Sequence, residues 1–266
     1  MIKKYIKEIE KKGYVLIPKV IPEKKCEKYK LILERDFKKY GHKHANVKQN
    51  GSLADKSLEK VVFNLHNKDL SFFALFQHPL VLKILDVILK KGSYQNKEPY
   101  YLNNISARCP LKGNPGQLIH LDSNLAGVNY NIITNVMWYL DDVDKKNGTT
   151  IVVPGSHNIK KYCNNNKIKN KIYIKAKKGS LLIFNANLWH GGSSKENDSS
   201  RWALVLGYAR WFIKPSFDYM KNTPMKIYSK LTKEQKALLG FDLIPPRDEF
   251  TRMTRRSNFF EKPSKY

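Results

Sequence analysis

The sequence predicts a mainly β fold with flanking helices, of the double-sheet sandwich or jelly-roll type. From residue 101 onward, short runs rich in β-branched and aromatic residues are separated by turns that contain glycine, proline or asparagine. Before residue 93, the apolar residues mostly follow helical spacing. Helices followed by about seven short strands are typical of a β-sandwich or jelly roll that is flanked by helices.

The chain of 266 residues is long enough to bury one substantial core. We expect a single domain over residues 1–266, since neither an internal repeat nor a sharp boundary is visible. Its predicted parts are a helical N-terminal part over 1–92, a β core over about 93–215 and a C-terminal extension over 216–266.

The N-terminal part is expected to hold a short strand between helices. Its predicted elements are a helix over 5–12 that ends at Gly13, a strand over 14–18, a helix from Pro22 to Gly41, a mobile polar loop over 42–56 and a helix over 71–91. Proline interrupts helices, so we expect Pro79 to break the last of these.

The β core is expected to follow Gly92. Its predicted strands cover 101–109, the segment around His120, 132–143, 149–153, 172–174, 180–184 and 201–212, and a helix over 232–239 ends at Gly240. Asn147-Gly148 is a turn signal between two of these strands, which predicts a hairpin there.

Charge and composition limit the function classes. The formal net charge of +26 would suit a polyanion as partner, but the lysines are spread along the whole chain and no nucleic-acid-binding motif is present. We therefore expect a solvated basic surface and do not expect nucleic acid as a partner. No run approaches the ~20 apolar residues of a membrane span, and no secretory signal is visible. Three cysteines without C-x-x-C spacing indicate free thiols in a reducing compartment, and we expect the cytoplasm.

The segment His120-Leu121-Asp122 is the strongest candidate for a chemical site. Residues i and i+2 of a strand lie on the same face, so both side chains can point into one cavity. A second imidazole would complete a two-His-one-carboxylate triad, which suits Fe(II) and leaves coordination positions open. His190 is the candidate, since it follows a predicted strand and precedes a glycine pair. A His-x-Asp pair alone is a weak signal.

The arrangement resembles the phytanoyl-CoA dioxygenase family of Fe(II)/2-oxoglutarate-dependent oxygenases over roughly residues 5–215. The matching segments are 12–18 (KGYVLIP), 120–122 (HLD), 138–143 (WYLDDV) with Asn147-Gly148, 153–157 (VPGSH), 178–184 (KGSLLIF), 190–192 (HGG) and Arg201. The resemblance implies a double-stranded β-helix core. It also implies that His120, Asp122 and His190 bind iron and that Arg201 binds the far carboxylate of 2-oxoglutarate, as a guanidinium can do with two hydrogen bonds.

Further residues are weaker candidates. Ser193 could reach the 2-oxoglutarate carboxylate, and Gln117 could bind 2-oxoglutarate or substrate, although turn chemistry and simple exposure are equal or better explanations. Arg108 and either Asn103 or Asn104 could face the cavity, but sequence does not fix their side of the strand. We expect core packing for Trp138 and Trp189. We expect no metal role for His157, His42 and His44.

The resemblance implies oxidation of a small molecule, with 2-oxoglutarate and O2 consumed and succinate and CO2 formed. Relatives that halogenate have a small residue where this chain has Asp122, so we expect hydroxylation or a related oxidation. Two alternatives stay open: a metal-dependent cupin-type enzyme that does not use 2-oxoglutarate, and a basic polyanion-binding protein with a vestigial site. The choice of substrate would depend on the loops over 42–60, 123–131 and 160–170. The sequence identifies neither the substrate nor the oligomeric state.

Overall fold

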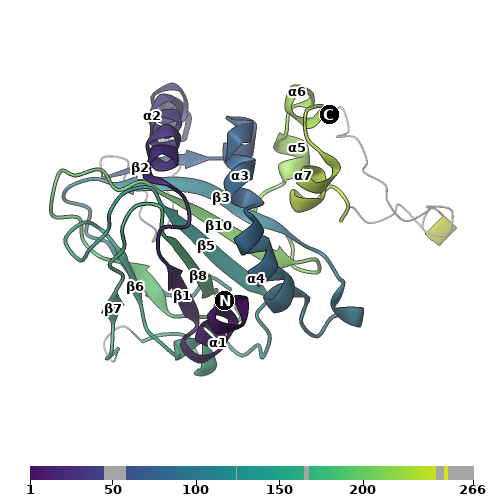
Figure 1. Ribbon diagram of the computed structural model, residues 1–266, viewed down its shortest axis with the longest axis horizontal. Helices are drawn as coiled ribbons and strands as arrows, with labels where there is room; N and C mark the ends of the chain where they lie inside the picture. The colour runs from purple at the N-terminus through teal and green to yellow at the C-terminus, as the bar shows by residue number, and fades with distance from the viewer. Residues whose placement is uncertain (45–57, 124, 165–167, 244–248, 251–266) are drawn as a thin grey trace.

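The computed structural model describes residues 1–44, 58–123, 125–164, 168–243 and 249–250. Two antiparallel sheets form the centre of the molecule, and helices cover one face of the larger sheet (Figure 1). The larger sheet has six strands in the order β1-β8-β5-β10-β3-β2, and the smaller has four in the order β4-β9-β6-β7. The predicted β fold with flanking helices is confirmed.

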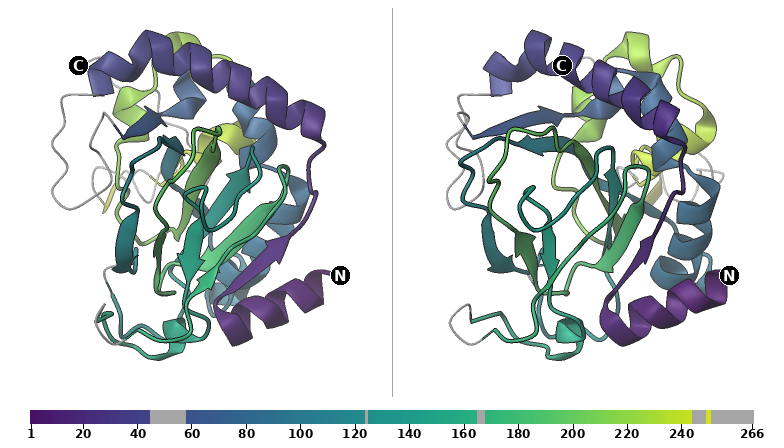
Figure 2. Two further views of the ribbon diagram at one scale, coloured as in Figure 1. Left: turned by 90° about the vertical axis from the view of Figure 1, so that its left-hand side faces the viewer. Right: turned by 60° about the vertical axis from the view of Figure 1, so that its left-hand side comes forward.

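The strands are short, apart from β3 in the larger sheet. Their bounds are β1 Tyr14–Ile17, β2 Glu59–Phe63, β3 Tyr100–Pro110, β4 Gln117–His120, β5 Ile133–Tyr139, β6 Thr150–Val152, β7 Ile172–Tyr173, β8 Leu181–Asn185, β9 His190–Gly192 and β10 Ala203–Arg210. The α-helices are α1 Ile2–Lys12, α2 Glu23–His44, α3 Phe73–Phe76, α4 Pro79–Lys90, α5 Tyr219–Asn222, α6 Met225–Tyr228 and α7 Lys233–Leu238. Helices α1 and α2 lie at opposite ends of the β core (Figure 2).

The larger sheet contributes apolar side chains to both of its faces. On β5 and β10, Val136, Trp138, Leu204 and Leu206 point to the helices and join the main hydrophobic core. Their neighbours along the strands, among them Met137, face the smaller sheet and join a second cluster. This follows from the two-residue period of a strand. We call the side toward the smaller sheet the inner face, and it is the side that bears the candidate site.

The predicted helix ends are partly confirmed. Gly13 ends α1 in a left-handed conformation with φ 87°, and its N–H binds the carbonyl of Ile9 over 2.8 Å. The end of α2 at Gly41 is wrong, since the helix continues to His44. A glycine costs a helix only about 1 kcal/mol, which the contacts of so long a helix can outweigh. Residues 45–56 of the predicted loop lie outside the described residues.

Pro79 breaks the predicted helix over 71–91 as expected. Helix α3 stops before it, and Pro79 is the first residue of α4, where its missing N–H is not needed. Among the described residues, no single helix is long and apolar enough to cross a membrane. One bent pair, Leu70–Phe76 with Pro79–Lys90, meets the length and composition test together, at a bend of 53°.

Two further differences concern the strands. The Asn147-Gly148 turn exists, with Gly148 at φ 67°, but it does not close a hairpin. It joins β5 of the larger sheet to β6 of the smaller one. Strand β2 was not predicted, although it pairs with β3 at the edge of the larger sheet. The prediction of one domain over the whole chain stays a prediction.

Candidate metal centre

Neighbouring strands of the smaller sheet bring the two histidines together. In the antiparallel pair of β4 and β9, His120 lies directly opposite His190, and their ring centroids are 4.4 Å apart. Directly opposed residues on one face are the closest cross-strand neighbours in a sheet. The ring of Phe184, on the inner face of β8, packs against His190 with a centroid distance of 4.7 Å. The seventy residues between the histidines in the sequence therefore do not separate them in space.

Asp122 completes the group from the segment that follows β4. Its backbone N–H binds the carbonyl of Ala186 over 2.9 Å, which fixes the chain as it leaves the strand. Its Oδ1 lies 3.2 Å from Nε2 of His120, and its Oδ2 lies 3.3 Å from Nε2 of His190. The three ligand atoms all lie within 4.8 Å of one another. The predicted convergence of the three side chains is what the structure shows.

The imidazole rings are oriented for binding through Nε2. Nδ1 of His120 donates to the carbonyl of Leu118, and Nδ1 of His190 donates to the carbonyl of Leu188, each over 2.9 Å. A carbonyl only accepts, so Nδ1 carries a proton, and Nε2 is the nitrogen of each ring that is directed at Asp122 and can serve as the ligand atom. Such outer hydrogen bonds fix the tautomer of metal-binding histidines. Two nitrogen donors and one carboxylate on one side fit Fe(II) and leave other positions open.

Asn135 holds the carboxylate from the opposite sheet. On the inner face of β5, its Nδ2 donates to Oδ2 of Asp122 over 2.7 Å. Loss of water around Asp122 would alone raise its pKa, but the charges and hydrogen bonds of His190 and His120 outweigh this and lower it well below the usual range. Burial would lower the pKa of His120, and its hydrogen bond to Asp122 raises it instead. The carboxylate is therefore ionised and ready to bind a cation.

Arg201 is a buried cation on the same side of the larger sheet. It lies two residues before Ala203, which faces inward, and its guanidinium is 5.9 Å from the ring centroid of Tyr139 on the inner face of β5. Arg201 is 6% exposed, and its Nε has no hydrogen-bond partner within the described part of the chain. Burial lowers its pKa. A guanidinium buried in this way calls for an anionic partner.

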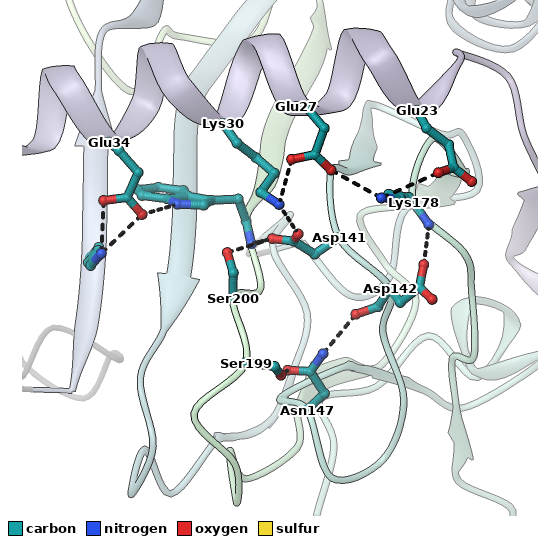
Figure 3. Close-up of polar contacts among 12 residues, drawn as sticks. Glu23, Glu27, Lys30, Glu34, Asp141, Asp142, Asn147, Lys178, Ser199 and Ser200 are labelled. Carbon is teal, nitrogen blue, oxygen red and sulfur yellow. Dashed lines mark hydrogen bonds and ion pairs between the residues drawn. The ribbon is translucent and has the colours of Figure 1, made fainter.

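A polar network anchored on α2 fixes the residues on either side of Arg201 (Figure 3). Oδ2 of Asp141 accepts hydrogen bonds from the N–H of Trp202 and the hydroxyl of Ser200, each over 2.8 Å. Its Oδ1 lies 2.6 Å from Nζ of Lys30 on α2. The indole of Trp202 donates to Glu34, also on α2, over 2.8 Å. Asp141 and α2 thus determine where the backbone of Arg201 lies.

The two weaker polar candidates lie on β4 and just after β9, the pair of strands that bears the histidines. Nε2 of Gln117 is 3.4 Å from Nε2 of His120, at the side of the triad. Ser193 follows β9, and its hydroxyl donates to the carbonyl of Lys145 over 3.0 Å. A role of either residue in binding 2-oxoglutarate or substrate stays a prediction.

The remaining candidates fall into two groups. Trp138 points to the helices and packs against His78, away from the inner face. Trp189 donates its indole N–H to the carbonyl of Lys161 over 3.0 Å, and Nε2 of His157 lies 3.1 Å from the carbonyl of Glu10. These three side chains lie outside the triad. By contrast, Asn104 and Arg108 alternate with core residues of β3, which puts them on the inner face.

Residues 9–203 match the family of phytanoyl-CoA dioxygenase (PhyH). The chain belongs to this family. The match includes His120, Asp122, His190 and Arg201, so the site described above lies inside the family domain. The family prediction is confirmed.

The relatives found by sequence are distant, and each match covers only part of the chain. The uncharacterized protein Rv1501 of Mycobacterium tuberculosis is 26% identical over 177 residues, which are 65% of this chain and 64% of that protein. The dioxygenase af480 of Aspergillus fumigatus is 25% identical over 149 residues, which are 54% of this chain and 48% of that protein. The chain therefore spans less than two thirds of the length of these relatives.

Solved structures share the fold of this PhyH-family chain. The epimerase SnoN, in complex with Fe3+, alpha ketoglutarate and nogalamycin RO, superposes with a TM-score of 0.63 at 15% identity, covering 84% of this chain and 90% of that chain. HygX from Streptomyces hygroscopicus, with nickel and 2-oxoglutarate bound, has a TM-score of 0.60 at 17% identity, covering 80% and 89%. These similarities confirm the predicted jelly-roll core.

Proposed function

We propose that the protein is an Fe(II)/2-oxoglutarate-dependent oxygenase that hydroxylates an unactivated C–H bond of a small-molecule substrate. The observation that carries the proposal is the triad: His120, Asp122 and His190 present their ligand atoms within 4.8 Å of one another. Membership in the PhyH family supports it, as do two structural neighbours solved with a metal and the same cosubstrate.

The chain's own residues have distinct tasks in this reaction. Nε2 of His120, Nε2 of His190 and a carboxylate oxygen of Asp122 would hold Fe(II), and Asn135 orients the carboxylate through its hydrogen bond to Oδ2. Iron and 2-oxoglutarate, when bound, supply the oxidation of the substrate C–H bond, and one O2 and one 2-oxoglutarate become the product hydroxyl, succinate and CO2. Three protein ligands leave positions free for cosubstrate and O2.

Arg201 binds the far carboxylate of 2-oxoglutarate. The guanidinium is buried, stacked on Tyr139 and without a partner for Nε among the described residues, so an incoming carboxylate would satisfy it. A hydrogen bond of this charge-assisted kind contributes about 1.5–3 kcal/mol. The ring of Tyr139 is held by a hydrogen bond of 2.9 Å from its hydroxyl to Thr150, so it supports the guanidinium from one side.

The presence of Asp122 supports hydroxylation rather than halogenation, because the carboxylate takes the position that a halide would need on the metal.

Cys26, Cys109 and Cys163 are free thiols, which supports the reducing, cytoplasmic setting that we propose.

The test is succinate release from the purified chain with Fe(II), O2 and a panel of small molecules, with and without 2-oxoglutarate. We expect succinate formation that depends on 2-oxoglutarate, is abolished in Asp122→Ala and requires a higher 2-oxoglutarate concentration in Arg201→Ala. Turnover of a substrate without 2-oxoglutarate would favour the cupin-type alternative. Salt-sensitive polyanion binding without any succinate would favour the binding protein. Normal turnover in both variants would contradict the proposal.

A further inference from the structure

A row of polar side chains on β3 lies beside the metal triad. Asn104, Ser106 and Arg108, which we call the β3 polar row, alternate with Ile105 and Ala107, two members of the core under the helices. Alternate residues of a strand point to opposite faces, so the row lies on the inner face. The sequence left the orientation of Arg108 open, and the structure settles it.

Gly207 links this row to the metal site. On β10 it pairs with Asn104 on one side and Asn135 on the other. A Cβ at Gly207 would lie 3.4 Å from Cβ of Asn104 and 3.5 Å from Oδ1 of Asn135, so these two side chains are close neighbours above the glycine. Asn135 in turn binds Asp122. Asn104 and Asn135 thus flank Gly207 on the inner face, and Asn135 connects this position to the metal ligand.

Two members of the row have unused hydrogen-bonding capacity. Ser106 is 0% exposed, and its hydroxyl has no partner among the residues that the structure describes. The same holds for Oδ1 of Asn104, which is also buried. Buried polar atoms are nearly always paired, so two unpaired ones side by side on the inner face indicate a place for a polar ligand.

Arg108 adds a positive charge at the end of the row. Its Nη1 donates to Oε2 of Glu59 on β2 over 3.1 Å, and this is its one hydrogen bond within the described residues. The Glu59 side chain is 3% exposed, whereas that of Arg108 is 23% exposed. Glu59 therefore holds the guanidinium from the buried side and leaves its other N–H groups without a partner among the described residues.

An aromatic surface continues the row toward the edge of the sheet. Phe63 lies opposite Ser106 in the pairing of β2 with β3, and therefore on the same face. Its ring contacts that of Phe217, with a centroid distance of 6.4 Å, and Phe217 is 42% exposed. A ligand held by Arg108 would meet these rings with its apolar part.

We propose that Arg108 binds an oxyanion of the primary substrate, a carboxylate or a phosphate, while Ser106 and Asn104 bind a polar substituent and Phe63 and Phe217 contact its apolar part. The guanidinium fork fits an oxyanion with two parallel hydrogen bonds. This inference rests on the proposed oxygenase function and names the substrate class for the same site.

The test uses the intact chain loaded with Ni(II), which does not support turnover, and 2-oxoglutarate. Hexanoate, hexyl phosphate and the neutral hexanamide are the probes, and calorimetric titration measures their affinity. We expect at least one of the two anions to bind, the amide to bind at least tenfold more weakly, and Arg108→Gln to lose that preference. The two anionic probes distinguish a carboxylate from a phosphate. Lys112→Gln is the matched control, since it removes an exposed cation that is paired with Asp198.

Arg108→Gln leaves Glu59 without its partner, so the double variant Glu59→Gln/Arg108→Gln is tested as well, with circular dichroism to verify folding. The affinity for 2-oxoglutarate should stay within about twofold of wild type in both variants. Binding of neither anion, equal binding of the amide, or an unchanged preference in Arg108→Gln would overturn the inference. A selective loss of affinity for 2-oxoglutarate in Arg108→Gln would also overturn it, because Arg108 would then bind the cosubstrate. If the wild-type chain binds no 2-oxoglutarate at all, the proposed function fails instead.

Discussion

Asn135 donates a 2.7 Å hydrogen bond to Oδ2 of Asp122, which links a strand of the larger sheet to the segment that leaves the smaller one. Asp122 follows β4 of the smaller sheet, whereas Asn135 lies on β5 of the larger one. The orientation of the one anionic ligand thus depends on how the sheets face each other. This couples the metal site to the packing of the jelly roll.

Replacement of Asn135 by alanine should weaken metal binding without removing a ligand. Loss of an outer hydrogen bond typically costs 10–100-fold in metal affinity, because Asp122 becomes free to rotate. Calorimetric titration of the apo chain with Ni(II) measures this. Asn129→Ala is the control, since Asn129 is an exposed residue of the neighbouring loop. Equal affinity in the two variants would show that Asn135 does not orient Asp122.

The glycine pair after His190 offers a matched comparison. A Cβ on Gly191 would lie 2.6 Å from the carbonyl oxygen of Gln117 and 3.1 Å from that of Leu118, so β4 and β9 would have to separate. A Cβ on Gly192 would meet its nearest atom at 3.5 Å, an ordinary contact. We expect Gly191→Ala to lower Ni(II) affinity at least tenfold, because it moves His190 relative to His120, and Gly192→Ala to change it less than threefold. The reverse order would contradict this geometry.

Neighbouring aspartates test the network that fixes Arg201. Asp141→Ala removes hydrogen bonds to Ser200 and Trp202 and the ion pair with Lys30. It should lower the free energy of unfolding by about 2 kcal/mol. It should also weaken 2-oxoglutarate binding about tenfold, because Asp141 no longer holds the backbone on either side of Arg201 in place. Asp142→Ala breaks an exposed ion pair with Lys177 and an exposed hydrogen bond from the backbone N–H of Lys178, each worth about 1 kcal/mol or less.

The readouts are urea unfolding and calorimetric titration with 2-oxoglutarate in the presence of Ni(II). A loss of stability in Asp141→Ala with unchanged 2-oxoglutarate affinity would limit Asp141 to a role in folding. Equal losses of stability and of 2-oxoglutarate affinity in both variants would show that the buried Asp141 is no more important than the exposed Asp142.

Buried His66 should make the fold sensitive to acid. The side chain is 0% exposed, and burial lowers the pKa of His66 from 6.5 to about 3. The unfolded chain therefore takes up a proton below about pH 6.5 that the folded chain does not, and stability falls as the pH falls through this window. Between about pH 7.5 and pH 5, His66 should cost about 2 kcal/mol of unfolding free energy.

His66→Phe should remove this component, because phenylalanine does not titrate and can keep the edge contact with Tyr219. Urea unfolding of wild type and variant at both pH values measures the difference, and the other histidines contribute equally to both proteins. If both proteins lose the same free energy on acidification, His66 is not the group responsible.

Much of the site was predictable because it depends on local patterns. The order of motifs around His120, Asp122 and His190 predicted the convergence, although Asp122 lies just past the end of β4 and not within the strand. The support from Asn135 was not predictable, although Asn135 interrupts an apolar run within a predicted strand. Its partner depends on how two sheets stack, which a single sequence does not specify.

The fold shows the same division between local and distant information. Pro79 and Gly13 act on their own neighbours, so the ends of these helices could be predicted. The expected hairpin at Asn147-Gly148 failed because a turn signal does not say which sheet the next strand joins. Strand β2, with the sequence EKVVF, is stabilised by pairing with β3 at a sheet edge. That pairing joins residues about fifty positions apart and brings Glu59 to Arg108.

The central claim is that one ferrous ion binds to His120, Asp122 and His190 and that 2-oxoglutarate binds to it. Anaerobic titration of the apo chain with Fe(II) and then with 2-oxoglutarate, followed by visible charge-transfer absorption, tests this most directly. The account predicts saturation at one Fe(II) and one 2-oxoglutarate per chain, with no absorption band in Asp122→Ala. A wild-type chain without the band, or an Asp122→Ala variant with an unchanged one, would contradict it.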